Sequence, residues 1–282
     1  MKRKAISAAV LGAALVAITV LGSMSGAGAS ASAARATTQN HFIANLGGST
    51  APRKLGYNIF DTGPTKSIVD GLPRGVRAMV WLGQKCPTSA TRAFRATVRR
   101  LARDRKVFGY YLSDEPHIAD CPSGPKALAT RTAYIRKVSS GRQRSFIVLN
   151  QSSADWYAGH RDYRSFRPAV TGVSLVGIDS YPCNNGSCDY SKIHTKSRWA
   201  KKYIKAKKLV PVYQAFGQEN TSDPYYSLPT ARQERRILAA WAAEFPSPVM
   251  DLTYGWRHQS SANPTLVDST VLQGVFRTWF GG

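Results

Sequence analysis

Short apolar runs alternate with amphipathic stretches along most of the chain. The apolar runs lie at 54–60, 76–82, 107–112, 145–149, 173–178, 209–213 and 249–254. Most of them are nearly continuous in apolar residues, whereas a strand with one face in water alternates apolar and polar side chains. The pattern therefore predicts parallel strands that are covered on both faces.

The stretches between these runs have the periodicity of helices. Phe94, Val98 and Leu101 fall on one face of the stretch after the second run, and arginines occupy the other faces. Further along, Thr230 and Gln233 have the spacing of a capping box. The box predicts the start of a helix that turns four apolar side chains inward: Ile237, Leu238, Trp241 and Phe245.

Strands that alternate with helices over about 250 residues are typical of a (β/α)8 barrel. We therefore predict an α/β fold with a single TIM-like barrel. The apolar runs are one short of eight, and residues 41–46 supply the missing strand unless the barrel is incomplete. A doubly wound open sheet is the alternative, but neither G-x-G-x-x-G nor a P-loop follows the first run. No internal linker or repeat interrupts the chain, which indicates one domain.

The first residues have the composition of a secretory signal peptide. Lys2, Arg3 and Lys4 precede an almost wholly apolar stretch at 5–21, and small residues with A-x-A cleavage patterns follow. A membrane anchor is the alternative, but the run of Gly, Ala and Ser suits cleavage better. We predict a signal peptide at 1–29, an N-terminal leader at 30–53 and the barrel domain at 54–282. The expected location is extracellular or cell-wall associated.

Export makes the four cysteines interpretable, because disulfides form and persist in oxidising compartments. Cys183 and Cys188 enclose a turn-forming tetrapeptide that brings them together, and Cys86 then pairs with Cys121 by exclusion. A zinc site would need two tight cysteine pairs or nearby histidines, and the sequence has neither. Two structural disulfides are predicted.

In a barrel of this kind, chemistry takes place where the strands end at the carboxyl-terminal face. The chain has just 16 acidic residues, yet carboxylates gather with amides and aromatic rings after the predicted strands. Aromatic faces suit the C–H faces of sugar rings, and Asn, Gln and Asp suit sugar hydroxyls. The candidates at these positions include Asp61, Tyr111, Asp114, Glu115, Asn150, Asp179, Tyr181, Gln214 and Trp256.

Four of these segments carry a family resemblance. GYYLSDEP at 109–116 resembles the strand-end motif of glycoside-hydrolase-like barrels, where the Glu before Pro is the general acid/base. GIDSYP at 177–182 and PVYQAFG at 211–217 are similar to later strand ends of that superfamily. YGW at 254–256 resembles its final strand, whose Trp floors the sugar site. The resemblance covers most of 54–282.

The resemblance implies a glycoside hydrolase with no cofactor. Glu115 would be the general acid/base at the end of the fourth strand, as in the retaining clan. Asp114 would orient it, and the partner would be a polysaccharide. Sugar contacts are expected from the surrounding polar and aromatic side chains: Tyr111, Asn150, Tyr181, Gln214 and Trp256.

The chain departs from that clan at the seventh strand. The clan places a nucleophilic Glu there, whereas this chain has Gln214 and Ala215. Asp179 is then the candidate second carboxylate, as nucleophile or as base for an inverting water. Ala215 favours inversion, with carboxyl groups ~6.5–9.5 Å apart. The remaining glutamates lie in a loop or on a helix: Glu219, Glu234 and Glu244.

Each candidate also has a structural interpretation. Glu115 before Pro116 would cap the next segment, and Asp114 would bond backbone amides in the turn. Asp179 would satisfy donors inside the barrel, and Gln214 would pack there. Asp251 and Thr253 lie in the middle of a predicted strand, so a structural role dominates for both.

Two other polar groups have simpler explanations than catalysis. His117 and Asp120 would form a metal cluster with the acidic pair, but no second His lies at ligand spacing, so no metal is predicted. The basic stretch at 196–208 is interpreted as a helix with a solvated basic face.

The excess of basic over acidic residues indicates which kinds of binding partner the protein favours. Lys and Arg number 39 against 16 Asp and Glu, a formal net charge of +23, which predicts a preference for anionic surroundings. Three functions stay open: hydrolysis of an anionic or cell-wall polysaccharide, glycan binding by a catalytically silent barrel, and charge-driven binding of teichoic or nucleic acid. No nucleic-acid motif is present, so nucleic acid is not expected. No membrane contact is expected after signal cleavage.

Overall fold

The structure is a computed structural model that describes residues 39–150, 159–218, 225–258 and 263–281. The predicted signal peptide at 1–29 lies outside the described residues. Within them, no helix is both long and apolar enough to cross a membrane.

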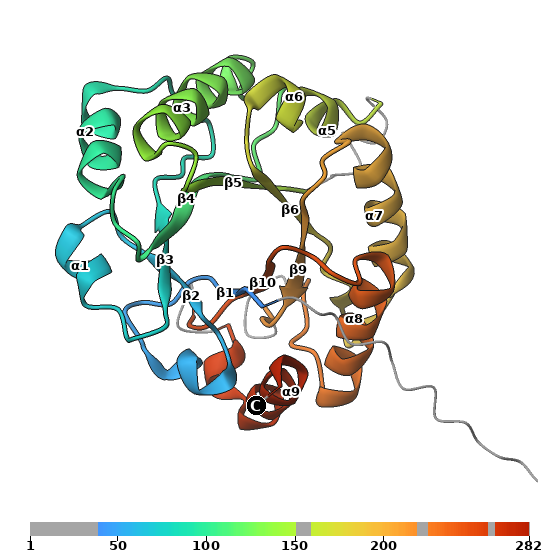
Figure 1. The fold of residues 1–282 in the computed structure, drawn as a ribbon. Coiled ribbons are helices and arrows are strands. Elements are labelled where there is room, and N and C mark those ends of the chain that lie inside the picture. Colours follow the sequence, from blue (N-terminus) through green and yellow to red (C-terminus); the bar gives the residue numbers. More distant parts are fainter. Residues whose placement is uncertain (1–38, 151–158, 219–224, 259–262, 282) are drawn as a thin grey trace, which may run out of the picture. The chain divides into compact units, whose positions relative to one another are not determined.

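Eight parallel strands close into a barrel that helices surround (Figure 1). Around the barrel the strands follow the order β1-β10-β9-β6-β5-β4-β3-β2. The closed sheet confirms the predicted (β/α)8 barrel and excludes the doubly wound sheet. The strands are β1 (His41–Ile43), β2 (Ile59–Thr62), β3 (Arg77–Trp81), β4 (Val107–Asp114), β5 (Arg144–Leu149), β6 (Leu175–Asp179), β9 (Leu209–Gln214) and β10 (Asp251–Tyr254).

The strand that the apolar runs lack is β1. Phe42 pairs with Leu252 of β10 on one side and with Ile59 of β2 on the other. The barrel therefore includes residues on the N-terminal side of residue 54. The strand expected at 54–60 starts too early, because Ala51–Leu55 form a 3-10 helix, η1. Gly56 ends that helix at φ 101°, a left-handed conformation that suits glycine.

Helices cover the outside of the barrel, and a two-stranded hairpin extends its rim. α2 buries Phe94, Val98 and Leu101, and the capping box of Thr230 and Gln233 begins α8, both as predicted. The elements are α1 (Lys66–Asp70), α2 (Arg92–Leu101), α3 (Gly124–Ser139), α5 (Arg161–Ser165), α6 (Pro168–Thr171), β7 (Cys183–Asn184), β8 (Ser187–Cys188), α7 (Ser191–Tyr203), α8 (Ala231–Glu244), η2 (Leu266–Asp268) and α9 (Thr270–Phe280).

Side chains fill the inside of the barrel. The ring of Phe42 meets those of Tyr111 and Phe146 edge-on, with centroids 6.4 and 6.1 Å apart. A second, larger cluster packs between the strands and the helices. Because the interior is closed by packed rings, ligands have access only at the two ends of the barrel.

Buried polar contacts join the first strand to the last. His41 Nδ1 lies 2.9 Å from Asp251 Oδ2, and the Tyr57 hydroxyl donates to Thr253 Oγ1 at 2.9 Å. The ring of Phe280 in α9 stacks on His41 at 3.8 Å. Asp251 and Thr253 thus have the structural role expected of mid-strand residues.

Both predicted disulfides form. Cys86 bonds to Cys121 and Cys183 bonds to Cys188. All four cysteines follow β3, β4 or β6, so the bridges lie at the carboxyl-terminal rim. The first connects two loops of that rim, and the second closes the β7–β8 hairpin.

Removing the bridge from Cys86 to Cys121 should destabilise the fold more than removing the one from Cys183 to Cys188. The cysteines are 35 residues apart in the first bridge and 5 in the second. Loop-closure entropy gives about 4 kcal/mol for the longer loop and about 2 kcal/mol for the shorter one. Urea unfolding of the two double Cys→Ala variants measures both losses. An equal or larger loss for the short bridge would contradict this account.

Candidate functional site

Carboxylates from alternate strands meet at the carboxyl-terminal rim. Asp61 lies in β2, Asp114 ends β4 and Asp179 ends β6. Glu115 directly follows β4. Because the strands are parallel and closed, these positions share one end of the barrel although they are far apart in sequence.

Glu115 has an unusual backbone conformation. Its φ is 45°, in the left-handed region that costs energy for a residue with a Cβ atom. Its N–H still donates to the Val148 carbonyl of β5 at 3.0 Å, which fixes the turn against the neighbouring strand. The Glu115 side chain is half-buried and reaches the carboxyl group of Asp179 within hydrogen-bonding distance.

Asp179 is 1% exposed. Burial raises its pKa well above 3.8, and the adjacent Glu115 carboxyl group raises the pKa further. Within the described part of the chain, neither Asp179 oxygen accepts a hydrogen bond from a neutral or cationic donor. Burial and the neighbouring carboxyl group therefore both favour the protonated, neutral form of Asp179.

Lys196 of α7 places a positive charge beside Asp179, where it acts to lower the pKa of that carboxyl group. Its Nζ donates to Asn150 Oδ1 at 2.7 Å and to the Asp179 carbonyl at 3.3 Å. Burial lowers the pKa of Lys196, while the charges of Asp179 and Glu115 act to raise it. The prediction that this helix has a solvated basic face is therefore wrong at Lys196, which is half-buried at the site. A cue was present in the sequence, since Ile193 lies three residues before it on the same buried helical face.

Asp114 faces the cavity beside the pair. The Tyr111 hydroxyl donates to Asp114 Oδ1 at 2.6 Å. Burial raises the pKa of Asp114 to about 6, and the charge of Glu115 adds to the effect. The ring of Trp81 packs edge-on against Tyr111 at 4.6 Å and is 38% exposed, so it offers a free aromatic surface.

Two cavities open at this rim. The larger, about 530 Å³, is lined by Asp61, Asp114, Trp81, Tyr254 and the loop at 44–50. A smaller one of about 390 Å³ is lined by Trp81, Lys85, Asp114, Glu115 and His117. Asp114 and Trp81 border both cavities, so a chain-like ligand that fills the two would pass beside them.

Asp61 is a second carboxylate with a raised pKa in the larger cavity. Burial raises the pKa of Asp61 to about 6, although the N–H of Asn45 donates to Oδ2 at 3.3 Å and acts in the opposite direction. Strand-end position had indicated Asp61, but Trp81, Tyr254 and Lys196 were not among the expected site residues. Trp81 and Tyr254 fall inside the predicted strands, where sequence does not distinguish packing from exposure.

Tyr181 belongs to an aromatic group on one side of the rim. Its ring lies 4.9 Å from Phe216 edge-on, 5.5 Å from Tyr226 edge-on and 6.4 Å from Tyr254 in a stacked arrangement. Burial raises the pKa of Tyr181 well above its usual value. The group provides the kind of wall that the sequence analysis expected for sugar rings.

Two expected sugar contacts are structural instead. Gln214 is fully buried. Its Nε2 donates to the carbonyls of Cys183 and Ser227 at 2.9 and 3.1 Å, and its Oε1 accepts the Cys183 N–H at 2.9 Å. Trp256 is 4% exposed and packs in the outer core, so it does not floor a sugar site. Tyr254 lines the cavity in its place.

Among the described residues, no group of three or more His, Cys, Asp or Glu side chains is arranged to hold a metal ion. His117 Nδ1 lies 2.7 Å from Asp162 Oδ2, so this histidine is engaged outside the acidic pair. Asn150, which was expected to contact sugar, accepts a hydrogen bond from Lys196 through its Oδ1.

Several solved structures share this barrel. A chitinase from Chromobacterium violaceum matches with a TM-score of 0.59 and 10% identity, over 87% of this chain and 100% of its own. A putative α-L-fucosidase from Bacteroides thetaiotaomicron matches with a TM-score of 0.53 and 10% identity, over 88% of this chain and 94% of its own. A variant GH128 (subgroup I) endo-β-1,3-glucanase from Amycolatopsis mediterranei, in complex with laminarihexaose, matches with a TM-score of 0.50 and 12% identity. This match covers 85% of this chain and 99% of the glucanase chain.

The chain therefore shares the (β/α)8-barrel fold of these solved structures. At these identities the likeness concerns the fold. No protein-family model matches the sequence, and no curated protein matches it.

Replacing Asp61 by Asn should stabilise the protein at pH 8 but not at pH 4. The folded-state pKa of about 6 exceeds the ordinary 3.8, so the folded state loses stability as pH rises from about 4 through about 6. The gain at pH 8 should be about 1–3 kcal/mol, measured by urea unfolding. Asp120→Asn, at an exposed position, is the control. An equal gain at both pH values would disprove the account.

Proposed function

We propose that the protein is a secreted glycoside hydrolase that cleaves a polysaccharide, with Glu115 as the general acid. The observation that carries the proposal is the Glu115–Asp179 carboxyl pair, which opens on an aromatic-walled cavity at the carboxyl-terminal rim. The shared barrel of known glycoside hydrolases supports it. So does the strand-end position of Glu115, which follows the fourth strand of the barrel.

A general acid must hold a proton at the working pH. Glu115 is the more accessible member of the pair, and Asp179 is the buried one. The proton passes from Glu115 to the glycosidic oxygen as the bond between that oxygen and the sugar carbon breaks. The pair is then left with an additional negative charge, which Lys196 stabilises from below.

Asp114 supplies the second carboxylate of the proposal. Asp114 borders both cavities and is ionised above pH 6. There it stabilises the positive charge that develops on the sugar ring. A water then adds to the sugar carbon and gives its proton to Glu115, which restores the acid and completes hydrolysis.

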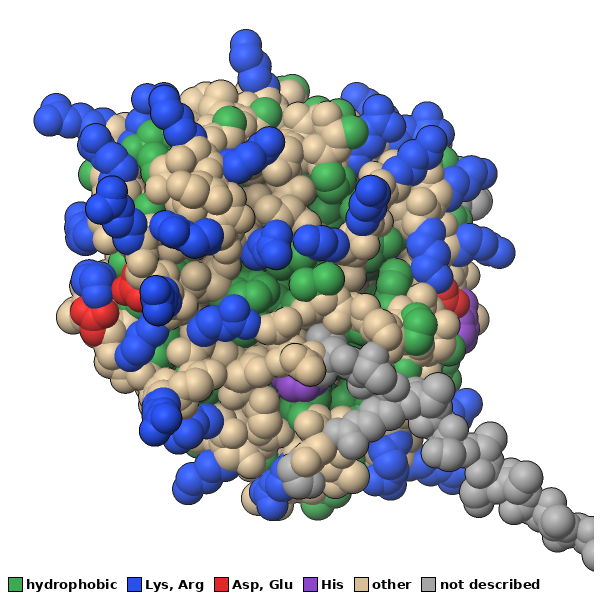
Figure 2. All heavy atoms as spheres, viewed as in Figure 1, with side chains coloured by type: hydrophobic (Ala, Val, Ile, Leu, Met, Phe, Trp, Pro, Cys, Tyr) green, Lys and Arg blue, Asp and Glu red, His purple; other side chains and the backbone are tan. Residues whose placement is uncertain are grey.

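The proposed substrate is an anionic or cell-wall polysaccharide. Lys and Arg side chains cover much of the face seen in Figure 2, and Asp and Glu are sparse on it. Exposed cations of this kind attract polyanions over about a Debye length, ~10 Å at 0.1 M salt. The predicted signal peptide would bring the protein to such material.

Glu115→Gln should lower hydrolysis by ~10²–10⁴, because the amide has no proton to give the leaving oxygen. Reducing-end release from a panel of acidic wall polysaccharides, β-1,3-glucan and chitin measures the rate. Glu244→Gln is the matched control, since this glutamate pairs with Lys201 and His194 on the outside of the barrel.

Unchanged hydrolysis by the Glu115→Gln variant would refute Glu115 as the acid. A wild-type protein that binds a glycan of the panel but turns over none would instead identify the barrel as a catalytically silent glycan-binding protein. Ala215, at the position where the resembling clan has its nucleophile, is the feature that favours this second function.

Lys196→Met should move the basic limb of the pH–rate profile to higher pH by on the order of one unit. The Lys196 charge acts to lower the pKa of Asp179, so its loss raises the pKa of the pair and keeps the acid protonated to higher pH. Lys202→Met, at an exposed position of the same helix, is the control. A limb that stays in place or moves to lower pH would contradict the assignment.

A further inference from the structure

A second large cavity lies at the end of the barrel opposite the carboxylates. Its volume is about 630 Å³, and it forms where β3, β4 and β5 begin and where the connections after α2 and α3 return to the barrel. Every cationic residue in its lining is an arginine. We call it the arginine pocket after these five residues: Arg77, Arg103, Arg105, Arg142 and Arg144.

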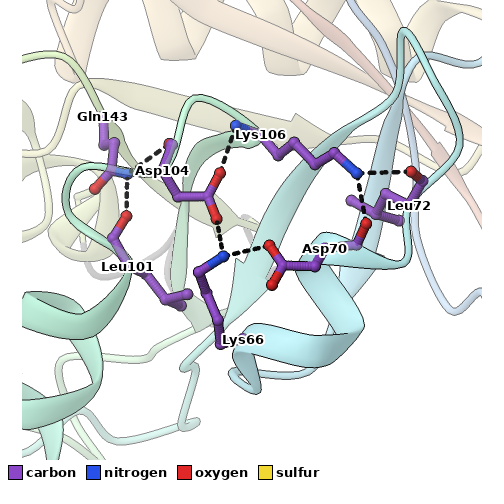
Figure 3. Close-up of polar contacts among 7 residues, drawn as sticks. All are labelled: Lys66, Asp70, Leu72, Leu101, Asp104, Lys106 and Gln143. Carbon is purple, nitrogen blue, oxygen red and sulfur yellow. Dashed lines mark hydrogen bonds and ion pairs between the residues drawn. The ribbon is translucent and has the colours of Figure 1, made fainter.

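Across the described ranges, no ion pair involves any of the five arginines of the arginine pocket. Asp104 also lines the pocket, but its charge is already matched. Its Oδ1 accepts the Lys106 N–H at 2.8 Å, and its Oδ2 lies 3.1 Å from Lys66 Nζ, as Figure 3 shows. Like charges gathered around one space favour an anion there.

Polar contacts fix the connection that carries Arg103 and Arg105. Lys66 bridges Asp104 and Asp70, and Lys106 Nζ donates to the carbonyls of Asp70 and Leu72 at 2.6 and 2.9 Å (Figure 3). On the other side, Gln143 Nε2 donates to the Leu101 carbonyl at 2.7 Å. The pocket wall is therefore ordered before any ligand arrives, which reduces the entropy cost of binding.

Arg77 and Phe108 form the inner wall. Arg77 Nη2 donates to Asn40 Oδ1 at 2.6 Å, and the guanidinium lies 4.5 Å from the centre of the Phe108 ring. This ring is the aromatic residue of the lining, and Arg77 covers it. Single-stranded nucleic acids bind through bases that stack on open aromatic faces. The pocket thus suits an anionic backbone better than a base.

We propose that the arginine pocket binds the phosphate groups of a linear phosphate polymer. Guanidinium groups bond phosphate oxygens in pairs. Here they converge from β3, β5 and two separate connections, so their donors approach from several directions. A tetrahedral phosphate presents oxygens in several directions, whereas a carboxylate presents two in one plane. The inference does not depend on the proposed hydrolysis, because it concerns the other end of the barrel.

The test compares two variants of equal net charge in the full-length protein. One replaces three exposed pocket arginines by Gln: Arg103, Arg105 and Arg142. The control replaces three exposed arginines of α7 and α8 by Gln: Arg198, Arg232 and Arg235. The probes are fluorescein-labelled inorganic polyphosphate and poly(glycerol phosphate), followed by anisotropy between 0.05 and 0.5 M NaCl.

The pocket variant should bind a phosphate polymer at least ~10-fold more weakly, with a salt-dependence slope smaller by about 2, while the control changes Kd by less than about 2-fold. The two probes separate a polyphosphate source from a polyol-phosphate source, and binding of either supports the proposal. Equally weakened polymer binding in both variants would show that net charge alone explains the effect, and it would overturn the proposed phosphate site. So would equally tight binding of polygalacturonate of matched charge, or no wild-type binding at 0.15 M NaCl.

Glu115→Gln should leave this binding unchanged, so failure of the proposed hydrolysis and failure of the phosphate site give different results. Unchanged thermal unfolding of the pocket variant confirms that the Gln replacements act on binding.

Discussion

Closure of the parallel sheet is the constraint on which the rest of the structure depends. It places the carboxyl end of every strand at one rim and the amino end at the other. Packed rings of Phe42, Tyr111 and Phe146 fill the space between, so the carboxylate rim and the arginine pocket lie at opposite ends. Asp114 and Asp179, separated by two strand–helix units, meet because β4 and β6 end on the same rim.

The two ends then differ in charge for different physical reasons. At the carboxyl end, partial burial keeps protons on acids, so Asp61 and Asp114 titrate near pH 6 and the protonated form of Asp179 is favoured. This arrangement costs stability at neutral pH, which is typical of functional sites. At the amino end, five arginines line one cavity, and within the described residues no ion pair involves them. One barrel thus carries an acidic rim on a strongly cationic molecule.

Continuous apolar runs were sufficient to predict the barrel and the strand that precedes Glu115. They did not reveal that a 3-10 helix ending at Gly56 precedes β2, because over five residues the apolar patterns of a 3-10 helix and a strand differ little. Strand-end position found the acidic residues, but it does not tell which way a side chain points. Trp256 and Gln214 were therefore misassigned, since both turn into the packed protein. Lys196 was assigned to the solvated face of its helix, although its spacing from Ile193 places it beside a buried position.

The contact between the first and last strands has a consequence for synthesis. β1 pairs with β10, and the ring of Phe280 near the end of α9 stacks on His41. During vectorial synthesis the edge of β1 therefore stays unpaired until more than two hundred further residues have followed it. An unpaired parallel edge is prone to wrong pairing. The β1 edge is therefore open to wrong pairing while nearly the whole chain is being made.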